Sequence, residues 1–151
     1  MPKPYSREQV VALLKEKAQL KQTVYDHTLK AFNMLKTLQQ KMTQEYNKKL
    51  EDADARVQLK YRSRGDFESE LKVAGDLLLF SMHTNIFEFN REHHIWSMPY
   101  VKEDPLNSYC GIIHVYNFLA DSFKYNREED LGYLITRIFI NHENHFFVEG
   151  K

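Results

Sequence analysis

The sequence predicts an α+β protein, in which a long N-terminal helix precedes an antiparallel β-sheet, or a partly closed barrel, of five to six strands. Residues 1–62 hold 13 Lys and Arg against 7 Asp and Glu and contain no glycine. Residues 63–151 hold 8 Lys and Arg against 14 Asp and Glu and contain all five glycines. Of the 20 aromatic residues, 14 lie beyond residue 75. These contrasts divide the chain into a basic helical arm, residues 1–55, and an acidic, aromatic-rich β-domain, residues 56–151.

The arm is predicted to be one continuous helix. Ser6 and Gln9 have the spacing of a capping box, in which each side chain bonds the backbone N–H of the other residue. Neither glycine nor proline occurs from residue 7 to residue 52, and apolar residues recur three or four positions apart. About 45 helical residues would span roughly 68 Å, about twice the width of a compact domain built from the rest of the chain. We therefore expect the helix to project, to bend back or to pair with another copy.

An apolar, heptad-like row on this helix predicts a homodimer that associates through a short coiled coil. The row consists of Val24, Ala31, Leu35, Leu38 and Met42. The alternative is that the helix, kinked once, packs the same stripe on its own β-domain. The net charges of the two halves, +6 and −6, would also let the helix of one copy lie against the β-domain of another.

The β-domain is predicted from runs in which apolar and polar residues alternate. A hairpin turning near Gly65 joins segments 57–61 and 67–73, and a long apolar segment, residues 76–90, reads as a central strand with a bend near His83. Residues 110–123, 133–140 and 146–148 are predicted to form three more strands. A helix over residues 116–125 is an open alternative for part of the first of these.

Residues 90–107, marked by two prolines, are predicted to form a functional loop. Large side chains gather in and beside it, namely His93, Trp96, Met98, Tyr100 and Tyr109. They are expected either to plug one end of the core or to form a surface for a protein partner or small ligand.

Two other classes of function remain alternatives. A nucleic-acid-associated protein would use the cations Lys41, Lys48, Lys49, Arg56, Lys60, Arg62 and Arg64. The cations of the helix are spread around its surface rather than gathered in a stripe, which makes this reading less favoured. A metal-dependent hydrolase or oxidoreductase would use His83, His114, His142 and His145, of which His142 and His145 are the candidate metal ligands.

The chain lacks the phosphate-binding, paired-cysteine and nucleophile motifs of common enzymes. Cys110 is the single cysteine, and in a strand it would lie roughly 13 Å from His114, too far for proton transfer, so we expect a buried structural thiol. We therefore predict no catalytic residue and no cofactor. The single cysteine, and apolar runs too short to span a membrane, indicate a cytoplasmic protein that does not enter membranes.

Residues 75–87, GDLLLFSMHTNIF, and residues 109–135, together with the opening residues 1–6, carry a resemblance to a family of small, uncharacterised gut-bacterial proteins. The resemblance spans nearly the whole chain and implies no activity, cofactor or site. Our interpretation is a non-enzymatic interaction or regulatory module that self-associates through its helix and offers the loop at residues 93–109 to a protein or small ligand.

Overall fold

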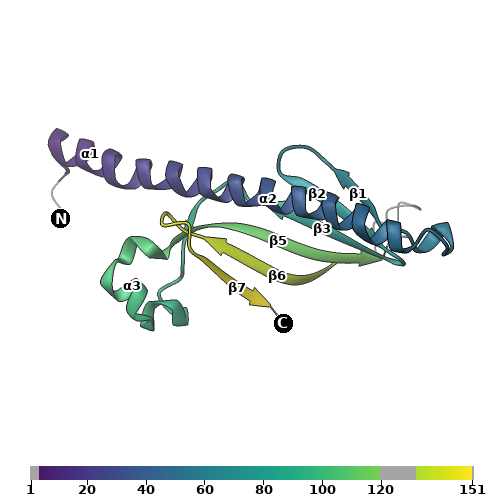
Figure 1. Ribbon diagram of the computed structural model, residues 1–151. Helices are drawn as coiled ribbons and strands as arrows, with labels where there is room; N and C mark the ends of the chain where they lie inside the picture. The colour runs from purple at the N-terminus through teal and green to yellow at the C-terminus, as the bar shows by residue number, and fades with distance from the viewer. Residues whose placement is uncertain (1–3, 120–131, 151) are drawn as a thin grey trace.

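Figure 1 shows the computed structural model of the chain, which describes residues 4–119 and 132–150. The N-terminal helix is 43 residues long and runs without a break through α1 (Arg7–Leu13), the π-helical turn η1 (Leu14–Ala18) and α2 (Gln19–Lys49). The predicted capping box begins it: the backbone N–H of Gln9 donates to Ser6 Oγ, and that of Ser6 donates to Gln9 Oε1. The long helix is confirmed.

The strands form one open, antiparallel sheet, which confirms the predicted α+β class. The sheet has seven strands in the order β1-β2-β3-β5-β6-β7, with β4 paired to β5 off this path. Their bounds are β1 Lys60–Ser63, β2 Glu68–Val73, β3 Asp76–Met82, β4 Phe87–Glu88, β5 Tyr109–Leu119, β6 Tyr133–Ile140 and β7 Phe146–Gly150. The count exceeds the predicted five to six because the bend after Met82 divides the long apolar segment into β3 and β4.

The strand β5 is the centre of the sheet and resolves one open alternative. It pairs with β3 along one side and with β6 along the other, and a β-bulge lies between Val115 and Tyr116. Because residues 116–119 make these ladder contacts, the described part of the 116–125 segment is strand and not helix. The remainder of that segment lies outside the described residues.

The helix packs on its own sheet instead of only projecting from it. In Figure 1, α1 extends past the sheet, while α2 crosses the face formed by β1, β3 and β5. Leu20, Val24, Thr28, Phe32 and Gln39 are the buried residues of α2. The first turns of the helix thus project, as one expectation had it, and the rest packs its stripe on the protein's own sheet, as the alternative expected.

Two close contacts fix α2 on the sheet. Gly111 of β5 lies directly beneath Thr28, so that a Cβ atom there would come within 2.1 Å of the Thr28 hydroxyl oxygen. At the other end of α2, the Asn47 side chain forms two hydrogen bonds with the backbone of Leu59, accepting from its N–H over 2.8 Å and donating to its carbonyl over 2.9 Å. The position of the helix is thus set near its middle, at Thr28, and near its C-terminal end, at Asn47.

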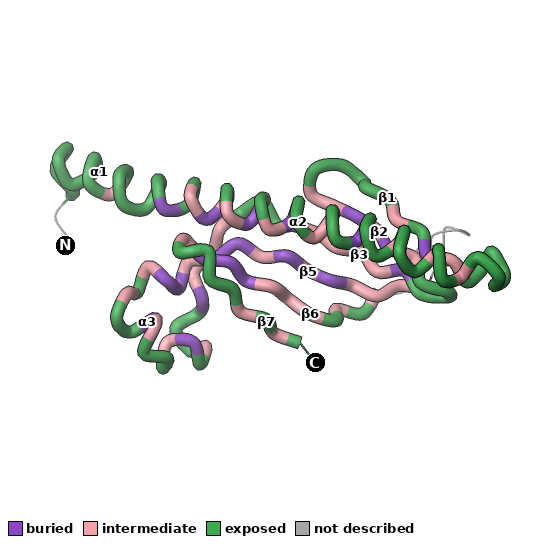
Figure 2. The backbone as a smooth tube through the Cα atoms, in the orientation of Figure 1, coloured by how far each residue is buried: buried purple, intermediate pink, exposed green. Residues whose placement is uncertain are grey.

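The opposite face of the sheet is covered at one end, over β5, β6 and β7, by the segment between β4 and β5. This segment contains three short helices, η3 (His94–Ser97), α3 (Pro99–Glu103) and η4 (Pro105–Ser108). It encloses a second apolar cluster around Phe89, Ile95, Val101, Cys110 and Phe139. Figure 2 shows the buried residues concentrated in α2, the centre of the sheet and this segment, while β7 is exposed or half-buried.

In the described part of the chain, no helix combines the length and the apolar character that crossing a membrane requires.

Candidate functional site

The aromatic loop serves first as a cover for the sheet. The Trp96 indole N–H donates to the Phe89 carbonyl over 3.0 Å, and the Arg91 guanidinium lies 3.8 Å from the centre of the Trp96 ring. His93 accepts a hydrogen bond from the backbone N–H of Ile95 and lies 3.3 Å from the Glu149 carboxylate. Trp96 and His93 are therefore held by contacts within the protein, as the plugging alternative expects.

Tyr100 and Met98 reach a cavity, whereas Tyr109 belongs to the sheet. Tyr109 is the first residue of β5 and is paired with Glu88 of β4. The Tyr100 hydroxyl donates to Glu143 Oε2 over 2.7 Å and accepts from Asn141 Nδ2 over 3.0 Å. Burial, followed by the nearby Glu143 carboxylate, raises the pKa of Tyr100. The five predicted loop residues thus divide between covering the core and lining a cavity.

This cavity, here called the loop pocket, lies between the loop and the β6–β7 hairpin. It has a volume of about 260 Å³ and combines an apolar floor with polar groups. Its lining residues are Ile95, Met98, Tyr100, Val101, Asn107, Cys110, Phe139, Asn141, His145, Phe146 and Phe147. The loop and the hairpin turn, far apart in the sequence, therefore build one concave site.

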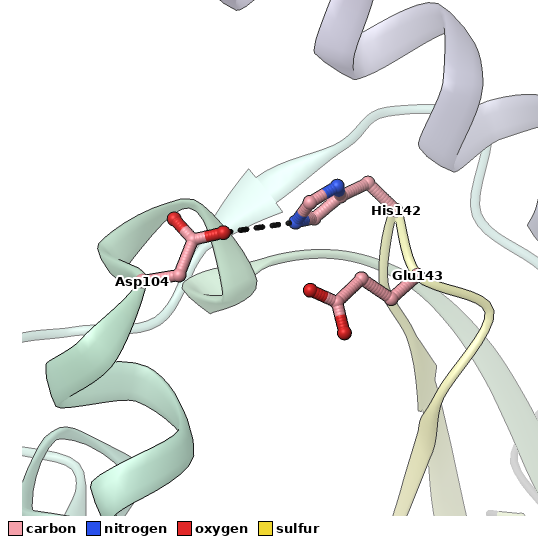
Figure 3. Close-up of side chains that lie close together, drawn as sticks. All are labelled: Asp104, His142 and Glu143. Carbon is pink, nitrogen blue, oxygen red and sulfur yellow. Dashed lines mark ion pairs between the residues drawn. The ribbon is translucent and has the colours of Figure 1, made fainter.

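Beside the loop pocket, one imidazole and two carboxylates converge. Figure 3 shows Asp104 at the start of η4 facing His142 and Glu143 in the turn between β6 and β7. One ligand atom from each of the three side chains lies within 4.8 Å of the others, and His142 Nε2 is 3.7 Å from Asp104 Oδ2. His142 Nε2 also donates to Asn107 Oδ1 over 2.7 Å. We call Asp104, His142 and Glu143 the turn cluster.

The second predicted metal ligand, His145, lies next to this cluster. Its Nδ1 is 3.7 Å from Glu143 Oε2, and its ring centre is 5.2 Å from that of Tyr100. The spacing of His142 and His145 identified the turn, but sequence reasoning missed Asp104, Asn107 and Glu143. Asp104 and Asn107 come from a segment more than 30 residues away, and no local pattern marks them.

The other candidates for chemistry lie apart from the turn cluster. Burial raises the pKa of Cys110 to about 12, so its thiol is protonated at neutral pH and is a poor nucleophile. Burial, with smaller effects of Arg137 and His83, lowers the pKa of His114. Among the described residues, the group suited to a metal ion contains neither His83 nor His114.

The predicted cations do not form an isolated basic stripe. Lys60 and Arg62 lie on the short strand β1, while Lys48 and Lys49 lie in the last turn of α2. Arg64 forms an ion pair with Glu70 over 3.1 Å, and Arg56 pairs with Asp54. These acidic partners weaken any attraction for phosphate groups.

A second concave surface, here called the open groove, lies where α2 leaves the sheet uncovered. It has a volume of about 390 Å³. Its lining residues are almost all apolar: Ala31, Met34, Leu35, Leu38, Ile113, Ile138, Ile140, Asn144, Phe146 and Val148. Three residues of the predicted self-association row, Ala31, Leu35 and Leu38, line it. Val24 does not, because it is fully buried against the protein's own sheet and is unavailable to a second copy.

Comparison of the chain with protein-family models, with curated proteins and with solved structures finds no match. The resemblance to gut-bacterial proteins thus stays a prediction.

Proposed function

We propose that the protein is a self-associating interaction module in which α2 of one copy docks in the open groove of a second copy. The observation that carries this proposal is a sheet only half covered by its own helix. The uncovered strand β7 leaves Phe146 at 74% and Val148 at 52% exposure, although both point to the helix-bearing face. Large apolar side chains gathered on one exposed face mark interaction sites.

The helix supplies the complementary surface. Met34, Leu38, Met42 and Tyr46 follow one another four residues apart on α2, and each is exposed. Residues with this spacing share one side of a helix. Met34 and Leu38 already form one wall of the open groove, so this row lies beside the uncovered strands of the same copy.

A two-fold arrangement would satisfy both surfaces at once. With two copies stacked face to face, the helix of each copy would cover the strands that the other copy leaves open. By the two-fold symmetry, every contact between a helix and the facing strands would occur twice. The two helices would then lie side by side between two sheets. The helical half of the chain is net +6 and the strand half is net −6, so each helix would be attracted to the strands of the other copy, while the two basic helices would repel each other.

The test is the assembly state of wild type and of Leu38→Asp, measured by sedimentation velocity from one to one hundred micromolar. Leu38 is 52% exposed, so the substitution should leave the monomer folded. Losing about 1.4 kcal/mol per copy, a modest figure for a buried leucine, would weaken a two-fold dimer about 100-fold. Leu14→Asp is the matched control, because Leu14 is comparably exposed, at 59%, on the same helix but lies in the projecting part.

We expect wild type and Leu14→Asp to dimerise and Leu38→Asp to remain monomeric. A monomeric wild type at tens of micromolar, or equal dimerisation of all three proteins, would show that the open groove is not a self-association surface.

The loop pocket supports a second candidate function, the binding of a small, mostly apolar ligand with one polar group. An apolar cavity with a few polar groups at its wall is the usual form of such a site, and Tyr100, Asn141 and His145 supply those groups here. Indole and phenol are suitable NMR probes. Shifts confined to loop-pocket residues would support the site, and no shifts at millimolar probe would exclude binding of this class.

A further inference from the structure

We infer that the turn cluster of Asp104, His142 and Glu143 binds a divalent first-row transition metal ion, of which Zn²⁺ and Mn²⁺ fit its donors best. The proposal is independent of self-association. Three side chains that can each donate one ligand atom converge from two separate segments, η4 and the β6–β7 turn (Figure 3). Three protein ligands with further positions left for water are the usual arrangement of open zinc sites.

Each donor is oriented by contacts outside the cluster. Asp104 caps η4 by accepting the backbone N–H of Leu106 at Oδ1, which leaves Oδ2 facing His142. The Asn141 side-chain oxygen accepts the backbone N–H groups of Glu143 and His145 and so holds the turn. Ligands whose positions are fixed before binding lose little conformational freedom when the ion arrives.

The spacing of the His142 and Asp104 donor atoms suits an intervening ion. His142 Nε2 lies 3.7 Å from Asp104 Oδ2, and a Glu143 carboxylate oxygen lies within 4.8 Å of both. The 3.7 Å separation is longer than a hydrogen bond. Two atoms 3.7 Å apart subtend about 120° at an ion held by bonds of ~2.1 Å, which falls within the range that zinc accepts.

The same contacts define what binding must displace. Asn107 is 3% exposed, and its Nδ2 donates to the Tyr100 carbonyl, so its Oδ1 faces His142. His142 Nε2 must therefore carry a proton in the metal-free protein. A bound ion would occupy this position on Nε2, the neutral imidazole would then carry its proton on Nδ1, and Asn107 Oδ1 would become available as a further oxygen donor.

The donor types select the class of metal. One imidazole nitrogen with two carboxylates and a nearby amide oxygen suits Zn²⁺ or Mn²⁺, whereas Ca²⁺ and Mg²⁺ prefer oxygen ligands alone. His145, next to Glu143, could add a second imidazole after a small side-chain movement. The bound ion would connect the loop that covers the sheet to the β6–β7 hairpin.

The experiment is isothermal titration of the metal-free full chain with Zn²⁺, Mn²⁺ and Ca²⁺, followed in parallel by the fluorescence of Trp96, the single tryptophan. We expect one Zn²⁺ or Mn²⁺ per chain, weak or absent Ca²⁺ binding and a change in Trp96 emission, because Trp96 lies in the covering loop. His142→Gln and Asp104→Asn should each weaken binding at least ~10-fold. His94→Gln is the matched control, because His94 is exposed in the same loop and stacks on His93.

Either of two results would overturn the proposal. One is wild-type protein that binds neither Zn²⁺ nor Mn²⁺ at 100 μM metal. The other is affinity and stoichiometry that stay unchanged in both His142→Gln and Asp104→Asn, which would assign the ion to other side chains. Circular dichroism of each variant separates loss of the ligand from loss of the fold.

Discussion

Replacing Gly111 by alanine tests how closely α2 is seated on the sheet. Gly111 lies on the central strand β5, and an added Cβ would stand 2.1 Å from Oγ1, 2.9 Å from Cβ and 2.9 Å from Cγ2 of Thr28. Thr28 has no exposed surface, and its hydroxyl donates to the Val24 carbonyl over 2.7 Å. The side chain cannot swing away without breaking that buried bond, so the helix or the strand must move.

The expected cost follows from overpacking a filled core. Extra carbon atoms in such sites destabilise proteins by about 1–3 kcal/mol, which corresponds to roughly 2–4 °C in Tm per kcal/mol for a chain of this size. Intrinsic preference acts in the opposite direction, because alanine is favoured over glycine within a strand by about 0.5–1 kcal/mol. Net destabilisation of Gly111→Ala therefore measures the contact with Thr28.

The assay is urea unfolding of a double-mutant cycle containing Gly111→Ala, Thr28→Ala and the double variant. Thr28→Ala removes Oγ1 and Cγ2 but keeps Cβ, so rescue should be partial, with a coupling free energy of about 0.5–3 kcal/mol. Gly75→Ala is the control, because no atom lies within 4 Å of its added Cβ and the expected change is a gain of about 0.4–1 kcal/mol. If Gly111→Ala were as stable as Gly75→Ala, the close seating of α2 would be wrong.

Two further predictions concern buried groups. Because burial raises the pKa of Cys110 from 9.0 to about 12, only the unfolded thiol ionises between these values, and the free energy of unfolding should fall from pH 9 towards pH 12. That fall should be smaller in Cys110→Ala, measured by urea unfolding; equal slopes would place the thiol in contact with water. Asn47→Ala should cost about 1–3 kcal/mol in the same assay, because it leaves the backbone N–H and carbonyl of the buried Leu59 without their partner. An unchanged midpoint would mean that water replaces the amide.

Much of the fold could be predicted because its signals are local. The capping box at Ser6 and the uninterrupted run that follows it specify the helix, and alternation specifies most strands. The two-residue strand β4 has no such signal, since its pairing with Cys110 and Tyr109 of β5 defines it. Tertiary pairing therefore explains the extra strand.

The spacing of the apolar residues on the helix does not show which surface they pack against. An apolar row packs equally well on a second helix or on a sheet, and the choice depends on the shape of the surface that faces it. Gly111 has no side chain, so α2 can approach β5 closely at Thr28. Val24, one turn earlier on α2, is then buried against the protein's own sheet. Leu38, farther along α2, remains exposed.

The candidate sites were predictable only in part, for the same reason. The aromatic composition identified the loop, and the spacing of His142 and His145 identified the turn. The carboxylate of Asp104 joins them only because η4 folds against the β6–β7 hairpin. Contacts between segments that are far apart in the chain follow no fixed spacing in the sequence.

The sedimentation velocity of the wild-type chain tests most directly whether a second copy completes the half-covered sheet. We predict a monomer–dimer equilibrium whose sedimentation coefficient rises with concentration across one to one hundred micromolar. A sedimentation coefficient that stays at the monomer value throughout this range would show that the open groove does not hold a second copy.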